Sequence, residues 1–158
     1  MASSTSKKVQ IQRFDREPLL GFVNPATYLT DVGVELMTLT GTVAVVPYPD
    51  VKTLYFVRDF GGQAGGGRRS FVSRPRLDGV WLRLTFTDRD TLEGVMPNNL
   101  LQVDTRGFHM IPPDGGQRVF VPRTALVEVQ VLGVVGSPLR TRKKPAREGQ
   151  IGLFEETA

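Results

Sequence analysis

The strongest constraint on the fold is a stretch that the chain contains twice. In each copy a short apolar run ends in Val-Pro, a brief turn follows, and a second apolar run continues the chain. The first copy lies at 46–57 and the second at 121–132, an offset of 75 residues without a gap. Similarity at a fixed offset indicates a duplicated structural unit. The alternative is that hairpins of any all-β chain resemble one another.

The match extends backward from this stretch, with spacings that differ by about one residue between the copies. The aligned blocks are Gly41–Pro47 with Gly116–Pro122, Gly33–Leu36 with Gly107–Met110, and Leu19–Pro25 with Leu92–Asn98. Four blocks in the same order favour duplication over chance. We therefore expect two repeats of one fold.

The local pattern of both repeats is that of short strands. Apolar and polar residues alternate, Gly and Pro punctuate the chain, and no stretch has the period of an amphipathic helix. Gly21 and Gly94, each in the middle of a strand, predict bulges or sharp bends. The predicted fold is all-β, with two tandem, strongly bent, five-stranded barrels of SH3-like size. The predicted segments are a disordered start (1–8), a first repeat (9–57), a connector rich in Gly and Arg (58–79), a second repeat (80–136) and a polar tail (137–158).

This succession of strands and turns resembles the Sm-like fold of the Sm, LSm and bacterial Hfq proteins. The resemblance covers residues 9–57 and 80–132, with a Leu-x-Gly at Leu19–Gly21 and again at Leu92–Gly94. It implies nucleic-acid contacts at the turn before the last strand, where this chain has Tyr48 and Arg123. At these two turns the chain has neither the Tyr-Lys-His of Hfq nor the Arg-Gly of Sm proteins.

The resemblance also implies an oligomer. In the family, six or seven folds form a ring by pairing their edge strands, which leaves no edge exposed. Two folds in each chain imply a homotrimer that makes a pseudo-hexameric ring.

Charge is distributed unevenly along the chain. The net charge is +4, but the residues from Val9 to Leu139 contain thirteen basic and thirteen acidic side chains. The excess therefore lies in the two ends, and any binding of a polyanion by the folded part requires a local patch. The connector supplies such a patch, with four arginines around Phe71 and Val72. These arginines are Arg68, Arg69, Arg74 and Arg76.

Two interpretations of the connector arginines remain open. They are a basic edge that meets the phosphates of RNA or DNA, or they are solvated side chains paired with Asp59 and Asp78.

The sequence offers no group of residues typical of an active site. There is no Cys, and the single His, His109, lies in a predicted strand, so we expect neither a metal nor another cofactor. The carboxylates of Asp88, Asp90 and Glu93 are expected to form a solvated edge at a hairpin. We expect a non-enzymatic protein. No apolar run approaches the length of a membrane span and the start lacks a signal-peptide core, which favours a cytoplasmic location.

The tail contains one specific motif, Gln150-Ile151-Gly152-Leu153-Phe154. It resembles the pentapeptide by which bacterial polymerases and repair proteins bind the DNA sliding clamp. In that mode, Leu153 and Phe154 are apolar anchors in a preformed groove and Gln150 is a hydrogen-bonding end. The alternative is that Ile151, Leu153 and Phe154 fold back onto the protein itself.

Three functions follow as hypotheses. The first is a nucleic-acid-associated, non-enzymatic Sm-like module. The second is an adaptor that binds the sliding clamp through its tail. The third is a structural module whose repeats bind only protein, and the neutral folded part favours it.

Overall fold

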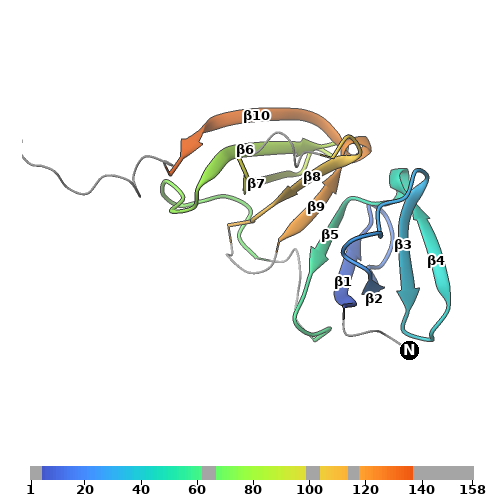
Figure 1. The fold of residues 1–158 in the computed structure, drawn as a ribbon. Helices are drawn as coiled ribbons and strands as arrows, with labels where there is room; N and C mark the ends of the chain where they lie inside the picture. The colour runs from blue at the N-terminus through green and yellow to red at the C-terminus, as the bar shows by residue number, and fades with distance from the viewer. Residues whose placement is uncertain (1–4, 62–66, 99–103, 114–117, 137–158) are drawn as a thin grey trace, which may run out of the picture.

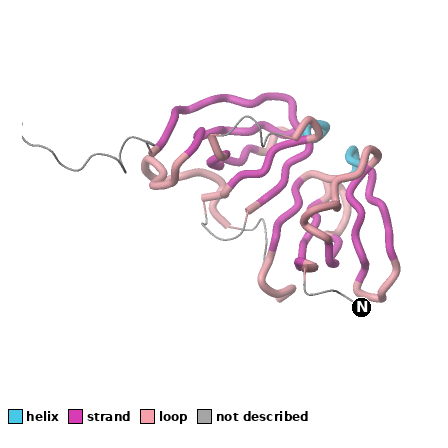
Figure 2. Tube along the Cα trace, in the orientation of Figure 1, coloured by secondary structure: helices cyan, strands magenta, loops and turns pink. Residues whose placement is uncertain are grey.

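The computed structural model describes residues 5–61, 67–98, 104–113 and 118–136, and its regular structure is almost entirely β (Figure 1). The strands are β1 (Lys7–Gln12), β2 (Leu19–Val23), β3 (Gly33–Thr38), β4 (Val43–Pro47), β5 (Thr53–Phe56), β6 (Gly79–Phe86), β7 (Thr91–Met96), β8 (Gly107–Met110), β9 (Val119–Pro122) and β10 (Leu126–Val135). Two three-residue 3-10 turns, η1 (Tyr48–Asp50) and η3 (Arg123–Ala125), precede β5 and β10 and appear as the only helical segments of the described chain in Figure 2. Within the described residues, no helix has the length and apolar character needed to cross a membrane.

The all-β prediction is confirmed, but the strands are not divided as expected. They form a seven-stranded antiparallel sheet, β4-β3-β2-β1-β5-β9-β8, and a three-stranded antiparallel sheet, β10-β6-β7. The described strands include no closed barrel, and the larger sheet contains strands from both repeats. The reason is that β5 of the first repeat pairs with β9 of the second, whereas β7 and β8 meet only at the bridge between Val95 and Ile111.

The two repeats nevertheless share one strand order and one register. The first runs β4-β3-β2-β1-β5, and the second runs β9-β8, the Val95–Ile111 bridge, then β7-β6-β10. Equivalent residues also face equivalent partners. Leu54 of β5 lies opposite Ile11, and Val129 of β10 lies opposite Leu84. The offset of 75 seen in the sequence therefore holds for the last strands in three dimensions.

The junction between the repeats is a continuous piece of sheet. Leu54 lies opposite Phe120 and Tyr55 lies opposite Val119, and the Phe56 N–H donates to the carbonyl of Arg118 at 3.1 Å. Every residue of β5 and β9 is buried. Alternate side chains point to opposite faces of a strand, so each face of the junction belongs to a different core.

Each repeat consequently borrows part of its core from the other. The first core gathers the buried side chains of β1–β5 and includes Phe120 from the second repeat. The second core includes Tyr55 from the first repeat, packed with Leu82, Leu84 and Phe86 of β6. Burial of this kind, at about 25 cal/mol per Å² of apolar area, is the main force that holds the two repeats together.

Two local predictions need correction. The first strand begins at Lys7 rather than after residue 8, because the backbones of Lys7 and Lys8 pair with β2 while Lys7 keeps its side chain in solvent. Pairing also runs without a shift through Gly21 and Gly94, so neither makes a bulge, and the alternative of a sharp bend stays a prediction. The register shifts lie in β10 instead.

Candidate functional site

The connector approaches the second repeat beside β7. The backbone N–H of Glu93 donates to the carbonyl of Arg69 at 2.8 Å, and the N–H of Phe71 donates to Oε1 of Glu93 at 3.1 Å. The ring of Phe71 also packs edge-on against Trp81, with 6.2 Å between centroids. These contacts hold the arginine-rich part of the connector against the sheet.

Glu93 is the central residue of this attachment. Its side chain is buried, although the sequence predicted a solvated edge. Oε1 also accepts a hydrogen bond from Nε1 of Trp81 at 3.1 Å, and Oε2 forms an ion pair with Arg83 at 3.2 Å. A buried carboxylate is tolerated only when it is paired and hydrogen-bonded. The alternation of residues along β7 could have indicated the face of the strand on which Glu93 lies. It could not have indicated the three donors that bind its carboxylate.

A shallow hollow of about 170 Å³ opens on this anchored segment. We call it the connector hollow. Its lining residues are Arg68, Phe71, Val72, Ser73, Arg74, Pro75, Arg76 and Pro113. The three arginines are exposed, and none of these lining residues carries a carboxylate. The guanidinium of Arg74 is also held in place, because its Nη2 donates to the carbonyl of Val134 at 2.7 Å.

This arrangement suits an anion with several oxygens. Guanidinium groups present planar pairs of donors that match phosphate and carboxylate geometry, and they stay charged at any physiological pH. Three of the four connector arginines predicted as a patch, Arg68, Arg74 and Arg76, therefore lie together around one hollow.

Arg69, the fourth arginine, points to a different partner. Its guanidinium forms an ion pair with Asp90, which also binds Nζ of Lys52 at 2.9 Å. Nζ of Lys52 in turn lies 2.8 Å from Asp88. Asp88 and Asp90 thus compensate Lys52 and Arg69, and Arg69 fixes the connector to the second repeat without lining the connector hollow.

The two turn residues predicted as nucleic-acid contacts differ from each other. Tyr48 in η1 is buried, and its hydroxyl donates to the carbonyl of Thr30. Burial raises the pKa of Tyr48, so the phenol stays neutral. Its own carbonyl accepts a hydrogen bond from the Thr124 hydroxyl at 3.1 Å, across the junction. Tyr48 therefore has a structural role. Its side chain is not accessible for the ligand contact that the resemblance implies.

Arg123 in η3 is exposed and lies over the ring of Phe108, with 5.4 Å to the centroid. It borders a separate surface hollow of about 200 Å³, with Phe108 and the start of β10. Arg123 thus stays available for an anion, but it does not line the connector hollow.

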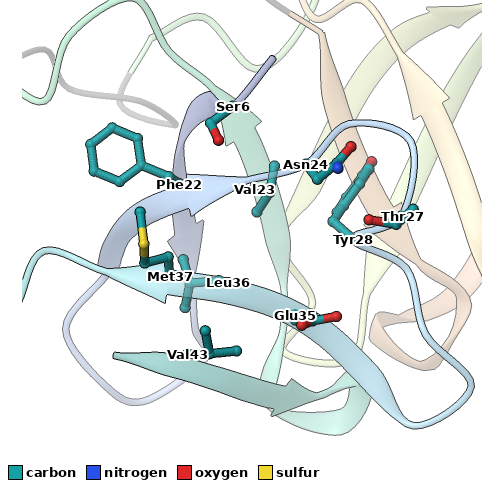
Figure 3. Close-up of a pocket in the computed structure, with 10 residues that line it drawn as sticks. All are labelled: Ser6, Phe22, Val23, Asn24, Thr27, Tyr28, Glu35, Leu36, Met37 and Val43. Atoms are coloured by element: carbon teal, nitrogen blue, oxygen red, sulfur yellow. The ribbon is translucent and has the colours of Figure 1, made fainter. Parts of the chain in front are cut away.

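The largest of these hollows, of about 300 Å³, lies where β2 and β3 diverge after only two paired positions (Figure 3). Phe22 and Met37 stand at one end, and Asn24, Thr27 and Tyr28 at the other. Glu35 is the one carboxylate in its lining. Its other lining residues include no Asp, His, Lys or Arg that could work with Glu35 as an acid–base pair.

His109 is a strand residue in β8, as the sequence indicated. Its Nε2 lies 2.5 Å from the hydroxyl of Tyr28 in the first repeat. Burial lowers the pKa of His109 to about 4, with a further contribution from Arg118. In the described part of the chain, no cluster of three or more His, Cys, Asp or Glu residues could hold a metal ion.

The tail residues Gln150, Ile151, Leu153 and Phe154 lie outside the described residues, as do the connector glycines at 62–66. Both tail hypotheses therefore stay predictions.

The chain belongs to a family of unknown function, DUF6982, whose model matches residues 5–133. The match spans both repeats and the connector as one unit. No curated protein matches the chain, and no solved structure matches it.

Proposed function

We propose that the chain is a non-enzymatic binding module of Sm-like type that associates with nucleic acid through the connector hollow. The observation that carries the proposal is the grouping of Arg68, Arg74 and Arg76 around one hollow, on a segment anchored by the buried Glu93. Anchoring matters because a preorganised arginine loses less side-chain freedom when it binds an anion.

The Sm-like assignment is supported by the strand order. Each repeat runs from its fourth strand through the third, second and first to the fifth, and a 3-10 turn precedes the fifth strand. The resemblance itself rests on the order of strands and turns along the sequence, and this spatial order of the strands adds support to it. The connector hollow, however, is lined by connector residues and by Pro113 of the second repeat. The ligand site that we propose is therefore not the turn site that the resemblance implies.

The charge distribution predicts how the binding of nucleic acid should depend on salt concentration. The folded part has as many acidic as basic side chains, so attraction to a polyanion comes from the local cluster. Each phosphate neutralised on a single strand contributes about −0.7 to the slope of log K against log salt. Two or three arginine contacts therefore predict a shallow but measurable salt dependence.

The experiment compares two double variants with the same change in net charge. Arg68→Gln/Arg76→Gln removes two guanidinium groups from the hollow, and Arg16→Gln/Arg58→Gln removes two exposed arginines elsewhere. Binding to fluorescent single-stranded RNA and DNA is measured by anisotropy from low to moderate salt.

We expect the hollow variant to lose about tenfold or more in affinity and to reduce the salt slope by about one to two. The control variant should stay close to the unmodified chain. Equal losses in the two variants, or no binding by the unmodified chain at low salt, would reject the proposal.

A further inference from the structure

A row of apolar side chains crosses the outer face of the first repeat, over β2, β3 and β4 (Figure 3). Phe22 lies opposite Met37, and Met37 lies opposite Val43. Paired residues of neighbouring strands point to the same face of a sheet. The alternate residues of β3, Val34 and Leu36, are buried in the first core. The row therefore lies on the face of the sheet that points away from this core.

A carboxylate stands next to this apolar row. Glu35 precedes Met37 by two positions on β3, so its side chain lies on the same face, opposite Val45 of β4. Glu35 is exposed. Within the described residues, no Lys, Arg or His forms an ion pair with it. The described part of the chain thus leaves the charge of Glu35 uncompensated beside an apolar surface.

The hollow of about 300 Å³ between β2 and β3, which we call the β2–β3 hollow, opens among these groups. The three apolar residues of the row and Glu35 all line it, and Glu35 is the one charged residue of the lining. The hydroxyl of Tyr28, at the other end, is already bonded to His109. Glu35 therefore supplies the charge that a ligand in this hollow meets.

The lining indicates the chemistry of the ligand. A ligand that is apolar throughout would remove water from Glu35 without pairing its charge, which costs free energy. An anion, such as a phosphate of nucleic acid, would be repelled by the carboxylate. An arginine side chain suits both parts of the lining, because its stem covers apolar surface and its guanidinium pairs with a carboxylate through two parallel hydrogen bonds. A guanidinium also stacks on aromatic rings such as that of Phe22.

The apolar surface continues beyond the hollow. Val43 and Val45 are 66% and 47% exposed, and β4 is a margin of the large sheet among the described strands. A single amino acid or a polyamine in the hollow would leave these valines in water, whereas a polypeptide would cover them. Arginine is enriched at the well-packed centres of protein–protein interfaces. The extent of the surface therefore favours a protein as the source of the arginine.

We infer that the β2–β3 hollow receives an arginine side chain of a different protein, with the guanidinium on Glu35 and the stem along Phe22 and Met37. Apolar residues beside that arginine in the partner cover the valines of β4. The inference goes beyond the proposed function, because it concerns the first repeat and a basic ligand. The connector hollow is lined by arginines instead and suits an anion.

The test uses the isotope-labelled full chain and two blocked peptides, acetyl-Gly-Leu-Arg-Leu-Gly-amide and the same peptide with citrulline in place of arginine. Citrulline keeps the length and shape of the arginine side chain but is uncharged. The amide chemical shifts of the protein report which residues each peptide contacts. We expect saturable shifts in β2, β3 and β4 around the hollow, and about tenfold tighter binding of the arginine peptide.

Two pairs of matched variants locate the contact. Glu35→Gln removes the carboxylate of the hollow, and Glu17→Gln removes an exposed carboxylate elsewhere. Val43→Gln makes the apolar row more polar, and Val127→Gln changes a valine of similar exposure on β10. We expect Glu35→Gln to lose about tenfold in affinity for the arginine peptide, and Val43→Gln to lose severalfold. The two control variants should bind like the unmodified chain.

A single-stranded oligonucleotide, titrated in the same way, separates this contact from the proposed function. It should shift amides of the connector and leave those around the β2–β3 hollow unchanged. An oligonucleotide that does not bind rejects the proposed function alone. The inference is overturned by equal affinities of the arginine and citrulline peptides, or by equal losses in Glu35→Gln and Glu17→Gln. It is also overturned if the oligonucleotide shifts the amides around the hollow, or if neither peptide does so.

Discussion

The hydroxyl of Tyr28 lies 2.5 Å from Nε2 of His109, although 81 positions of the chain separate the two residues. The contact joins β8 of the second repeat to the loop after β2 in the first. Burial raises the pKa of Tyr28 and lowers that of His109 to about 4, so both groups are neutral near pH 7. A neutral imidazole accepts at one ring nitrogen, which makes this a hydrogen bond between uncharged partners, sensitive to acid.

The protonation of His109 predicts a loss of stability between about pH 6.5 and pH 4. The unfolded chain takes up a proton at its ordinary pKa of about 6.5, whereas the folded chain resists it down to about 4. The unfolded state therefore binds more protons in this window, and the free energy of unfolding decreases as the pH falls. The full effect is at most about 3 kcal/mol.

The measurement is denaturant unfolding at several pH values for the unmodified chain and for His109→Gln, which cannot titrate. Between pH 6.5 and 4.5 the stability of the variant should change much less. The Arg106 guanidinium beside Asp104 holds the pKa of that carboxyl below its usual value, so its titration falls outside this window. Parallel pH profiles for the two proteins would show that His109 is already accessible to protons.

We expect Gly21 and Gly94, the two mid-strand glycines, to respond differently to substitution by alanine. The three atoms nearest to a Cβ at Gly94 would all belong to the side chain of Met110, whereas those nearest to a Cβ at Gly21 include the backbone carbonyl of Met37 as well as Leu36. Overpacking of this kind costs roughly 1–3 kcal/mol. Gly21→Ala and Gly94→Ala should both destabilise the protein.

A double-mutant cycle separates the two cases. Met110→Ala should relieve much of the cost of Gly94→Ala, giving strongly non-additive unfolding free energies. Leu36→Ala should not relieve Gly21→Ala to the same degree, because the carbonyl of Met37 remains. Gly133→Ala is the control, since no atom lies within 4 Å of its added Cβ. Additive cycles at both sites would contradict the prediction.

The tail motif predicts that the full chain binds a bacterial sliding clamp. We expect micromolar affinity, weakened tenfold or more by Leu153→Ala/Phe154→Ala, because apolar anchors of this kind dominate peptide docking. Glu155→Ala/Glu156→Ala, in the same tail, is the matched control and should bind nearly normally. Surface plasmon resonance or calorimetry measures both. Indistinguishable affinities of the two variants would remove the adaptor hypothesis and favour the self-docking alternative.

Much of the fold was predictable from local pattern. On β6, Val80, Leu82, Leu84 and Phe86 alternate with other residues, as expected for a strand with one buried face; the last three are buried and Val80 is half-buried. The Val-Pro turns predicted before the last strands coincide with η1 and η3. Such features depend on neighbours a few residues apart, so the period of the side chains reveals them.

The candidate site was only partly predictable. The sequence grouped four connector arginines, but their partners lie far along the chain. Arg69 meets Asp90, whereas Arg74 meets the backbone of Val134. The sequence groups Glu93 with Asp88 and Asp90 at a polar hairpin turn, where carboxylates are usually solvated. Its burial depends on Trp81 and Phe71, which only the folded sheet brings to it.

The sequence by itself predicted that this protein is made of short strands and that its unit occurs twice, with an offset of 75 residues between the last strands of the two repeats. Only the tertiary structure decided that β5 pairs with β9, that Tyr48 is buried and that β4 and β10 lie at sheet margins among the described strands. The physical reason is that a strand carries the same alternating pattern and the same backbone donors whichever strand lies beside it. Which strand pairs with which depends on contacts between residues far apart in the chain, and a local sequence pattern does not reveal those contacts.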